Sequence, residues 1–129
     1  MVEAKEPNLA KNVLGEPLVS CSNKPMTGFF RDGCCNSCAE DMGMHTICSQ
    51  VDATFLQFSQ SRGNDLSTPR PEFEFPGLKP GNRWCLCLPR WLEALKAGCA
   101  PPVYLDGTHS SVLQYVQLDV LKQYAVQDN

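Results

Sequence analysis

A chain of 129 residues with 43% hydrophobic and 19% charged residues has room for one folded domain with one core. Its net charge of −3 weighs against nucleic acid and anionic membrane as partners, because both need clustered Lys and Arg. No apolar segment approaches the roughly 20 residues that cross a bilayer, and the first residues lack the apolar stretch of a secretory signal. We therefore expect a cytoplasmic protein whose partner is a small molecule or another protein.

Eight cysteines are the unusual feature of this composition. An even count indicates a disulfide framework only in a secreted chain, since glutathione keeps cytoplasmic thiols reduced. The cysteines then serve as small buried side chains, as metal ligands or as a reactive thiol. Burial is the commonest of these roles for any single cysteine.

The first half of the chain predicts one strand and one helix after irregular segments. Residues 1–12 form a loose polar arm, and a single domain follows over 13–129. Turn-forming residues then dominate up to a strand predicted over 45–50, where β-branched side chains occur. A helix is predicted over 53–62, with Asp52 as its N-cap and a glycine directly after it.

Residues 63–82 predict a long loop that is ordered. The segment contains four prolines, so neither a helix nor a central strand can run through it. Its apolar side chains argue against disorder, because a disordered loop would leave them exposed to water. We expect Phe75 and Leu78 to be mostly buried.

The second half predicts two more strands, each followed by helix. In the strand over 83–88, alternation places Trp84 and Leu86 on one face and Cys85 and Cys87 on the other. The remaining predicted elements are a helix over 89–97 that begins at a proline, a strand over 103–106, and two short C-terminal helices. This alternation predicts a mixed α/β fold, with a small three-stranded, mostly parallel sheet, helices packed on it and two long ordered loops.

Several strings occur together along this chain: TGFFRDGCC (27–35), GMHTIC (43–48), GNDLSTPRPEF (63–73), FPGLKPG (75–81), RWCLCLPRW (83–91) and APPV (100–103). Taken jointly, they resemble the domain of unknown function family 2237, small proteins found mostly in bacteria and in some protists. The resemblance covers about residues 12–126 and implies a small single domain. It brings no established activity and no established catalytic residues. It also implies that Cys38 and Cys99 lie outside any site that the family shares.

A metal site is the first functional hypothesis. Cys35, Cys38, His45 and Cys48 have a spacing at which Cys and His ligands can surround a tetrahedral Zn²⁺. Two residues three apart in a strand point to opposite faces, which weighs against His45 and Cys48 sharing one ion. In a variant of this hypothesis, residues 34–48 supply one pair of ligands, and Cys85 and Cys87 supply the other.

A reactive thiol is the second hypothesis. Cys87 lies at the end of a predicted strand and just before a helix N-terminus, where the helix dipole favours a thiolate. His109 follows the third predicted strand. If both strands are parallel neighbours, Cys87 and His109 emerge at the same sheet edge and form a nucleophile and base.

Further candidates for ligand binding are the loop residues Arg31, Asn64 and Asp65, together with Arg83 at the start of a predicted strand. The alternative is that the loop side chains among them only cap turns. The leading interpretation is a Cys/His-rich end that binds zinc or a small ligand in a structural or binding role. A thiol-dependent enzyme that uses Cys87 with His109, and a protein-interaction module that uses 63–82, stay open as alternatives.

Overall fold

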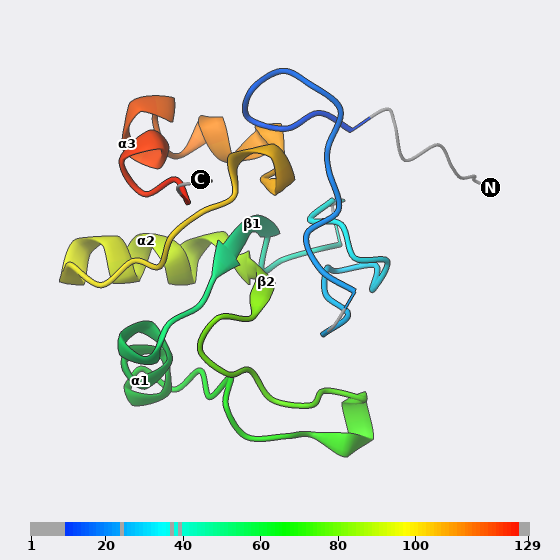
Figure 1. The fold of residues 1–129 in the computed structure, drawn as a ribbon, viewed down its shortest axis with the longest axis vertical. Helices are drawn as coiled ribbons and strands as arrows, with labels where there is room; N and C mark the ends of the chain where they lie inside the picture. The colour runs from blue at the N-terminus through cyan, green and yellow to red at the C-terminus, as the bar shows by residue number, and fades with distance from the viewer. Residues whose placement is uncertain (1–9, 24, 37, 39, 127–129) are drawn as a thin grey trace.

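The computed structural model describes residues 10–23, 25–36, 38 and 40–126. The described elements are β1 (His45–Gln50), α1 (Ala53–Ser61), η2 (Pro71–Phe73), β2 (Arg83–Cys87), α2 (Leu88–Ala97), η3 (Leu105–Gly107), η4 (Ser110–Gln114) and α3 (Leu118–Gln123) (Figure 1). No helix in this part of the chain is long and apolar enough to cross a membrane. Most of the predicted arm over 1–12, and the last three residues of the predicted domain, lie outside the described residues.

The predicted three-stranded, mostly parallel sheet is wrong. The strands β1 and β2 form a two-stranded antiparallel sheet, in which His45 pairs with Cys87 at one end and Gln50 with Arg83 at the other. The predicted third strand over 103–106 is reduced to isolated bridges of Val103 with Ser49 and Ala125. Two prolines precede Val103 and a 3₁₀ turn begins at Leu105, so too few residues remain for a ladder.

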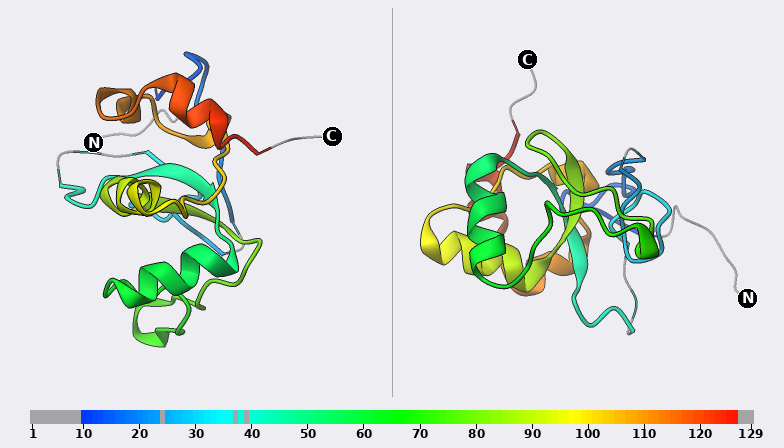
Figure 2. Two further views of the ribbon diagram at one scale, coloured as in Figure 1. Left: turned by 90° about the vertical axis from the view of Figure 1, so that its left-hand side faces the viewer. Right: turned by 90° about the horizontal axis from the view of Figure 1, so that it is seen from below.

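The elements stack in three tiers around the sheet. The sheet and α2 form the middle tier, with α1 on one side of it and the C-terminal 3₁₀ turns and α3 on the other (Figure 2). Trp91 of α2 is fully buried, and its indole N–H donates to the Pro101 carbonyl at 3.2 Å. The helix α1 begins where predicted, because the Asp52 carboxylate accepts a hydrogen bond from the Phe55 amide at 2.8 Å.

The long loop over 63–82 is ordered, and the predicted burial of its apolar residues is confirmed. Phe75 and Leu78 are 9% and 2% exposed. The Phe75 ring packs edge-on against Trp84, with 5.2 Å between ring centroids. The loop therefore forms a wall of the domain next to β2.

Two disulfides replace four of the expected free thiols. They join Cys21 to Cys48 and Cys35 to Cys85, and all four residues are buried. The four pairing residues are called the cysteine cluster below. Their partners lie 27 and 50 residues apart in the sequence, so no local spacing predicts them. The cluster fastens the segment over 21–35 to both strands, on the side of the sheet away from α2 (Figure 1).

Candidate functional site

The free thiol of Cys87 lies beside the imidazole of His45. The register of the sheet makes these residues direct cross-strand partners, His45 at the start of β1 and Cys87 at the end of β2. The two side chains lie close enough for the Cys87 thiol to raise the pKa of His45. Cys87 is also the N-cap of the ten-residue helix α2, so the sheet passes into the helix at the thiol itself.

Asp41 fixes the orientation of the His45 ring. One carboxylate oxygen lies 2.6 Å from His45 Nδ1, and the other accepts the His45 backbone N–H at 2.8 Å. The Asp41 side chain is fully shielded from solvent, whereas the His45 side chain is 35% exposed. Because Nδ1 faces Asp41, Nε2 is the ring nitrogen left for Cys87. The three side chains form an acid–imidazole–thiol chain, the arrangement by which proteins activate a cysteine.

The same contacts set the charge of His45. Hydrogen bonding to Cys87 and electrostatic attraction to its sulfur, together with the hydrogen bond and charge of Asp41, raise the pKa of His45 to about 9. Burial opposes this shift and is outweighed. At neutral pH His45 therefore holds its proton and stands as a cation beside the sulfur.

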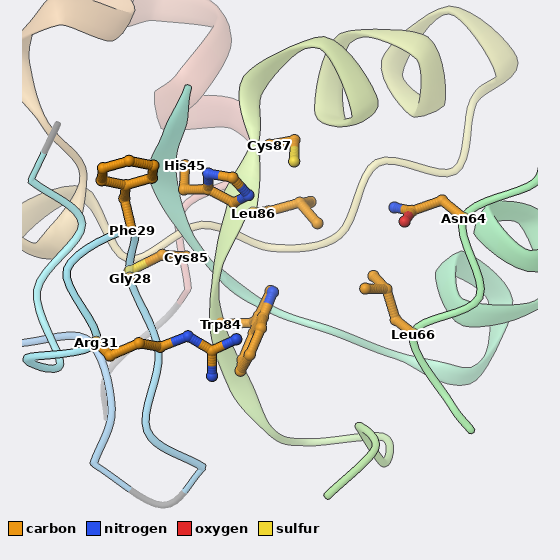
Figure 3. A pocket seen from close by; sticks show the side chains of 10 residues that line it. All are labelled: Gly28, Phe29, Arg31, His45, Asn64, Leu66, Trp84, Cys85, Leu86 and Cys87. Atoms are coloured by element: carbon orange, nitrogen blue, oxygen red, sulfur yellow. The ribbon is translucent and has the colours of Figure 1, made fainter. Parts of the chain in front are cut away.

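A cavity of about 280 Å³ opens at this pair (Figure 3). Trp84, Leu86 and Cys87 of β2 form one wall, and Asn64 and Leu66 face them from the long loop. The third side comes from the segment that the disulfides fasten, through Gly28, Phe29 and Arg31.

Gly43 lets the backbone pass close to the reactive pair. A Cβ atom at this position would lie 2.9 Å from His45 Cε1 and 3.3 Å from the sulfur of Cys87. The first distance is shorter than real Cβ contacts, so any side chain would displace the imidazole. A glycine is thus needed in the turn between Asp41 and His45, because the backbone there lies against the His45 ring and the Cys87 sulfur.

His109, the partner predicted for Cys87, lies in a different environment. Its Nδ1 accepts the Ser111 N–H at 3.0 Å and caps η4, and burial lowers the pKa of His109. It lines a second cavity with Cys38 and Asp41, whereas Cys87 lines the cavity with His45. The predicted meeting rested on parallel strands, which the antiparallel sheet does not provide.

The sequence therefore missed His45 as the partner of Cys87 and missed Asp41 entirely. The missed signal was that His45 opens the first predicted strand and Cys87 lies near the end of the second. Antiparallel pairing brings two such positions together.

The four predicted ligand-binding residues separate into two pairs. Arg31 and Asn64 both line the cavity at Cys87. Asp65 turns back on its own loop, and hydrogen bonds from the Thr68 side chain and the Ser67 and Thr68 amides lower its pKa. The Arg83 guanidinium lies 3.8 Å from the centroid of the Tyr104 ring, and Arg83 is not a lining residue of this cavity.

Of the residues predicted to bind zinc, Cys35 and Cys48 lie in the cysteine cluster, together with the alternative ligand Cys85. Among the described residues, metal-binding atoms converge only at Cys21, Cys35 and Cys85, whose sulfurs lie within 4.8 Å of one another. Cys38 and His45 are not in this group, since the Cys38 thiol contacts Glu40 and His45 is held by Asp41. Cys21 was missed because it lies outside the compact Cys/His spacing.

The loop over 63–82, predicted as an interaction surface, exposes one of its two phenylalanines to solvent. Phe73 is 65% exposed, whereas Phe75 is buried against Trp84. Both rings line one open cavity together with Leu66 and Trp84.

The model of one protein family matches residues 11–125, and its description is "Uncharacterized protein conserved in bacteria (DUF2237)". The match spans most of the chain, so the protein belongs to this family, as its sequence motifs predicted. A search of the curated proteins finds no match. The family description assigns no activity, and function is therefore argued from the site.

Proposed function

We propose that this DUF2237 protein is a thiol-dependent enzyme in which Cys87 attacks the carbonyl carbon of a small acyl compound. His45, rather than His109, serves as its proton-transfer partner, and Asp41 orients His45. The observation that carries this proposal is the continuous chain from the shielded Asp41 through His45 to Cys87 at the mouth of a cavity.

The reaction follows from the charges of the pair. The Cys87 thiolate forms a bond to the acyl carbon, and His45 gives its proton to the leaving group as the old bond breaks. Water then attacks the thioester and passes a proton to His45, which restores the thiolate and imidazolium as the C–S bond breaks. The positive end of the α2 dipole at Cys87 favours the negative charge that develops on the acyl oxygen.

Limited alkylation with iodoacetamide, mapped by mass spectrometry, tests the thiol. Cys87 is expected to react about tenfold or more faster than the free cysteines Cys34, Cys38 and Cys99. His45→Gln should remove this advantage, and the matched variant His109→Gln should keep it. Equal labelling of all free cysteines, or loss of the advantage in His109→Gln alone, would overturn the proposal.

Acyl chemistry is tested separately with p-nitrophenyl acetate. A burst of one nitrophenolate per protein, with an acetyl group on Cys87, is the expected result. The Cys87→Ser variant should lack the burst, while Cys99→Ser should retain it. A burst that persists in Cys87→Ser would assign the acylation to another group.

A second candidate function is zinc binding by the cysteine cluster. It is supported by the convergence of three of the four buried sulfurs within 4.8 Å. A cytoplasmic location belongs to this proposal, because glutathione would reduce both disulfides there and free four thiolate ligands. Zinc would then serve a structural role and hold the segment over 21–35 against the sheet.

Cobalt is a suitable probe of this second candidate. Protein reduced with a dithiol should take up one Co²⁺ with the visible absorption of a tetrahedral thiolate site, and Zn²⁺ should displace it. Cys21→Ser should weaken the binding at least tenfold, whereas Cys38→Ser should leave it unchanged. Fully reduced protein that binds no metal would exclude the site.

A further inference from the structure

We infer that the compound bound beside Cys87 is small and carries a carboxylate, which Arg31 recognises. This inference rests on the proposed function and adds to it the class of substrate.

Arg31 has no carboxylate partner among the described residues. Within the described part of the chain, Arg62, Arg70 and Arg90 each lie within 4.0 Å of a glutamate, and no carboxylate pairs with Arg31. The neighbouring Asp32 uses a carboxylate oxygen to accept the Cys34 amide at 3.0 Å. A guanidinium in a binding cavity that lacks a protein carboxylate is suited to a ligand carboxylate, which it can bind through two parallel hydrogen bonds.

The backbone holds Arg31 in place. Its φ of 54° lies in the left-handed region, which a residue with a side chain rarely adopts. The Arg31 amide donates to the Gly28 carbonyl at 3.0 Å, and the guanidinium carbon lies 5.6 Å from the Trp84 ring centroid. Figure 3 shows the side chain reaching from its loop toward Trp84, at the opposite end of the cavity from Cys87.

The rest of the cavity fits the same ligand. His45 adds a second positive charge, and none of the described lining residues is acidic. Leu66 and Leu86 provide apolar contact between the two charged ends, and Asn64 provides an amide. A volume of about 280 Å³ lies at the lower limit of ligand cavities, so the ligand is a small one. An acyl compound with its carboxylate at Arg31 would extend its reactive carbon toward Cys87.

Iodoacetate and iodoacetamide provide the test, because they have similar size and differ in the carboxylate. At pH 7 in 150 mM salt, the rate ratio of iodoacetate to iodoacetamide should be about tenfold higher at Cys87 than at Cys99. Arg31→Gln should lower the iodoacetate rate at Cys87 about tenfold and change the iodoacetamide rate less than twofold. Arg83→Gln is the matched control, since its guanidinium also lies on an aromatic ring but does not line the cavity.

A second measurement needs no variant. Propionate should slow the alkylation of Cys87 by iodoacetamide in a saturable manner, and propionamide should not. Fast alkylation without charge preference or propionate protection would overturn the inference and leave the proposed function intact. Equal loss of both alkylation rates in Arg31→Gln would also overturn it, because the guanidinium would then act on the thiol. Slow reaction of Cys87 with both reagents would instead overturn the proposed function.

Discussion

At the scale of single residues, one buried carboxylate determines what the histidine can do. Asp41 bonds both the ring and the backbone amide of His45, and these two contacts offset part of the cost of shielding its charge from water. The oriented ring lies beside the Cys87 thiol, although the His45 side chain is 35% exposed to solvent. In the proposed enzyme, the reactivity of Cys87 therefore depends on Asp41 through the ring of His45.

Asp41→Asn tests this dependence. The amide retains an acceptor oxygen but removes the negative charge, so the pKa of His45 should fall below about 9. An NMR titration of the His45 ring protons measures this pKa, and Cys87 alkylation at pH 7 should slow about tenfold. Asp65→Asn, which alters an exposed turn, should change neither quantity. If the pKa of His45 is the same in Asp41→Asn as in the wild type, Asp41 does not set the charge of His45.

The pKa of His45 also predicts how stability depends on pH. The folded state binds the proton more tightly than the unfolded state, because the pKa is raised from 6.5 to about 9. The stabilisation is complete below pH 6.5 and is lost as the pH rises through about 9. Urea denaturation across this interval should show a larger loss of unfolding free energy in the wild type than in His45→Gln. Parallel pH profiles of the two proteins would contradict the assignment.

At the scale of elements, local sequence signals predicted the positions of the helices, whereas they did not predict how the strands pair. Asp52 before α1 and Pro89 at the start of α2 act within one helical turn, and both helices occur where the sequence placed them. Whether β1 and β2 pair parallel or antiparallel depends on the path of the segment that connects them. No residue close in sequence to either strand determines that path. The same distinction applies to the site. Cys87, Arg31 and Asn64 were recognised individually, whereas the meeting of His45 with Cys87 required the register.

The cap of α1 gives a direct test at this scale. Asp52→Ala removes the acceptor for the Phe55 amide and should cost about 1 kcal/mol of unfolding free energy. Thermal denaturation should show a Tm lower by roughly 3 °C. Asp119→Ala is the comparison, because this residue lies in the first turn of α3 and is not its N-cap. A loss in Asp119→Ala as large as that in Asp52→Ala would exclude capping as the cause.

The packing of the long loop is tested by two apolar truncations. Leu78→Ala should cost roughly 2–4 kcal/mol, because the side chain is only 2% exposed. Phe73→Ala should cost less than about 0.5 kcal/mol, because that ring is 65% exposed. Denaturant unfolding of both variants measures the difference. Equal costs would show that the loop does not pack as described.

At the scale of the whole molecule, the cysteine cluster joins segments that are distant in sequence. The pairs lie 27 and 50 residues apart, so each disulfide restricts the unfolded chain considerably. Disulfides persist in oxidising compartments, whereas a reducing cytoplasm would open them. The redox state of the compartment thus decides whether the segment with Arg31 is fastened covalently.

Loss of one disulfide should measure this contribution. The double variant Cys35→Ala/Cys85→Ala should lose roughly 4 kcal/mol of unfolding free energy, from the loop that the bond closes. Denaturant unfolding under non-reducing conditions measures it, with Cys38→Ala as the control because Cys38 is a free thiol. If a dithiol lowers the Tm of this double variant as much as that of the wild type, the Cys35–Cys85 bond contributes nothing.

No loop separates β2 from α2 at Cys87, so the proposed nucleophile lies on two elements that pack into the core. A compound too large for the cavity must displace the facing wall, where Asn64 and Leu66 belong to the proline-rich loop. In the proposed enzyme, sequence change in this loop would alter which compounds fit beside Asn64 and Leu66, and would leave Cys87, His45 and Arg31 in place.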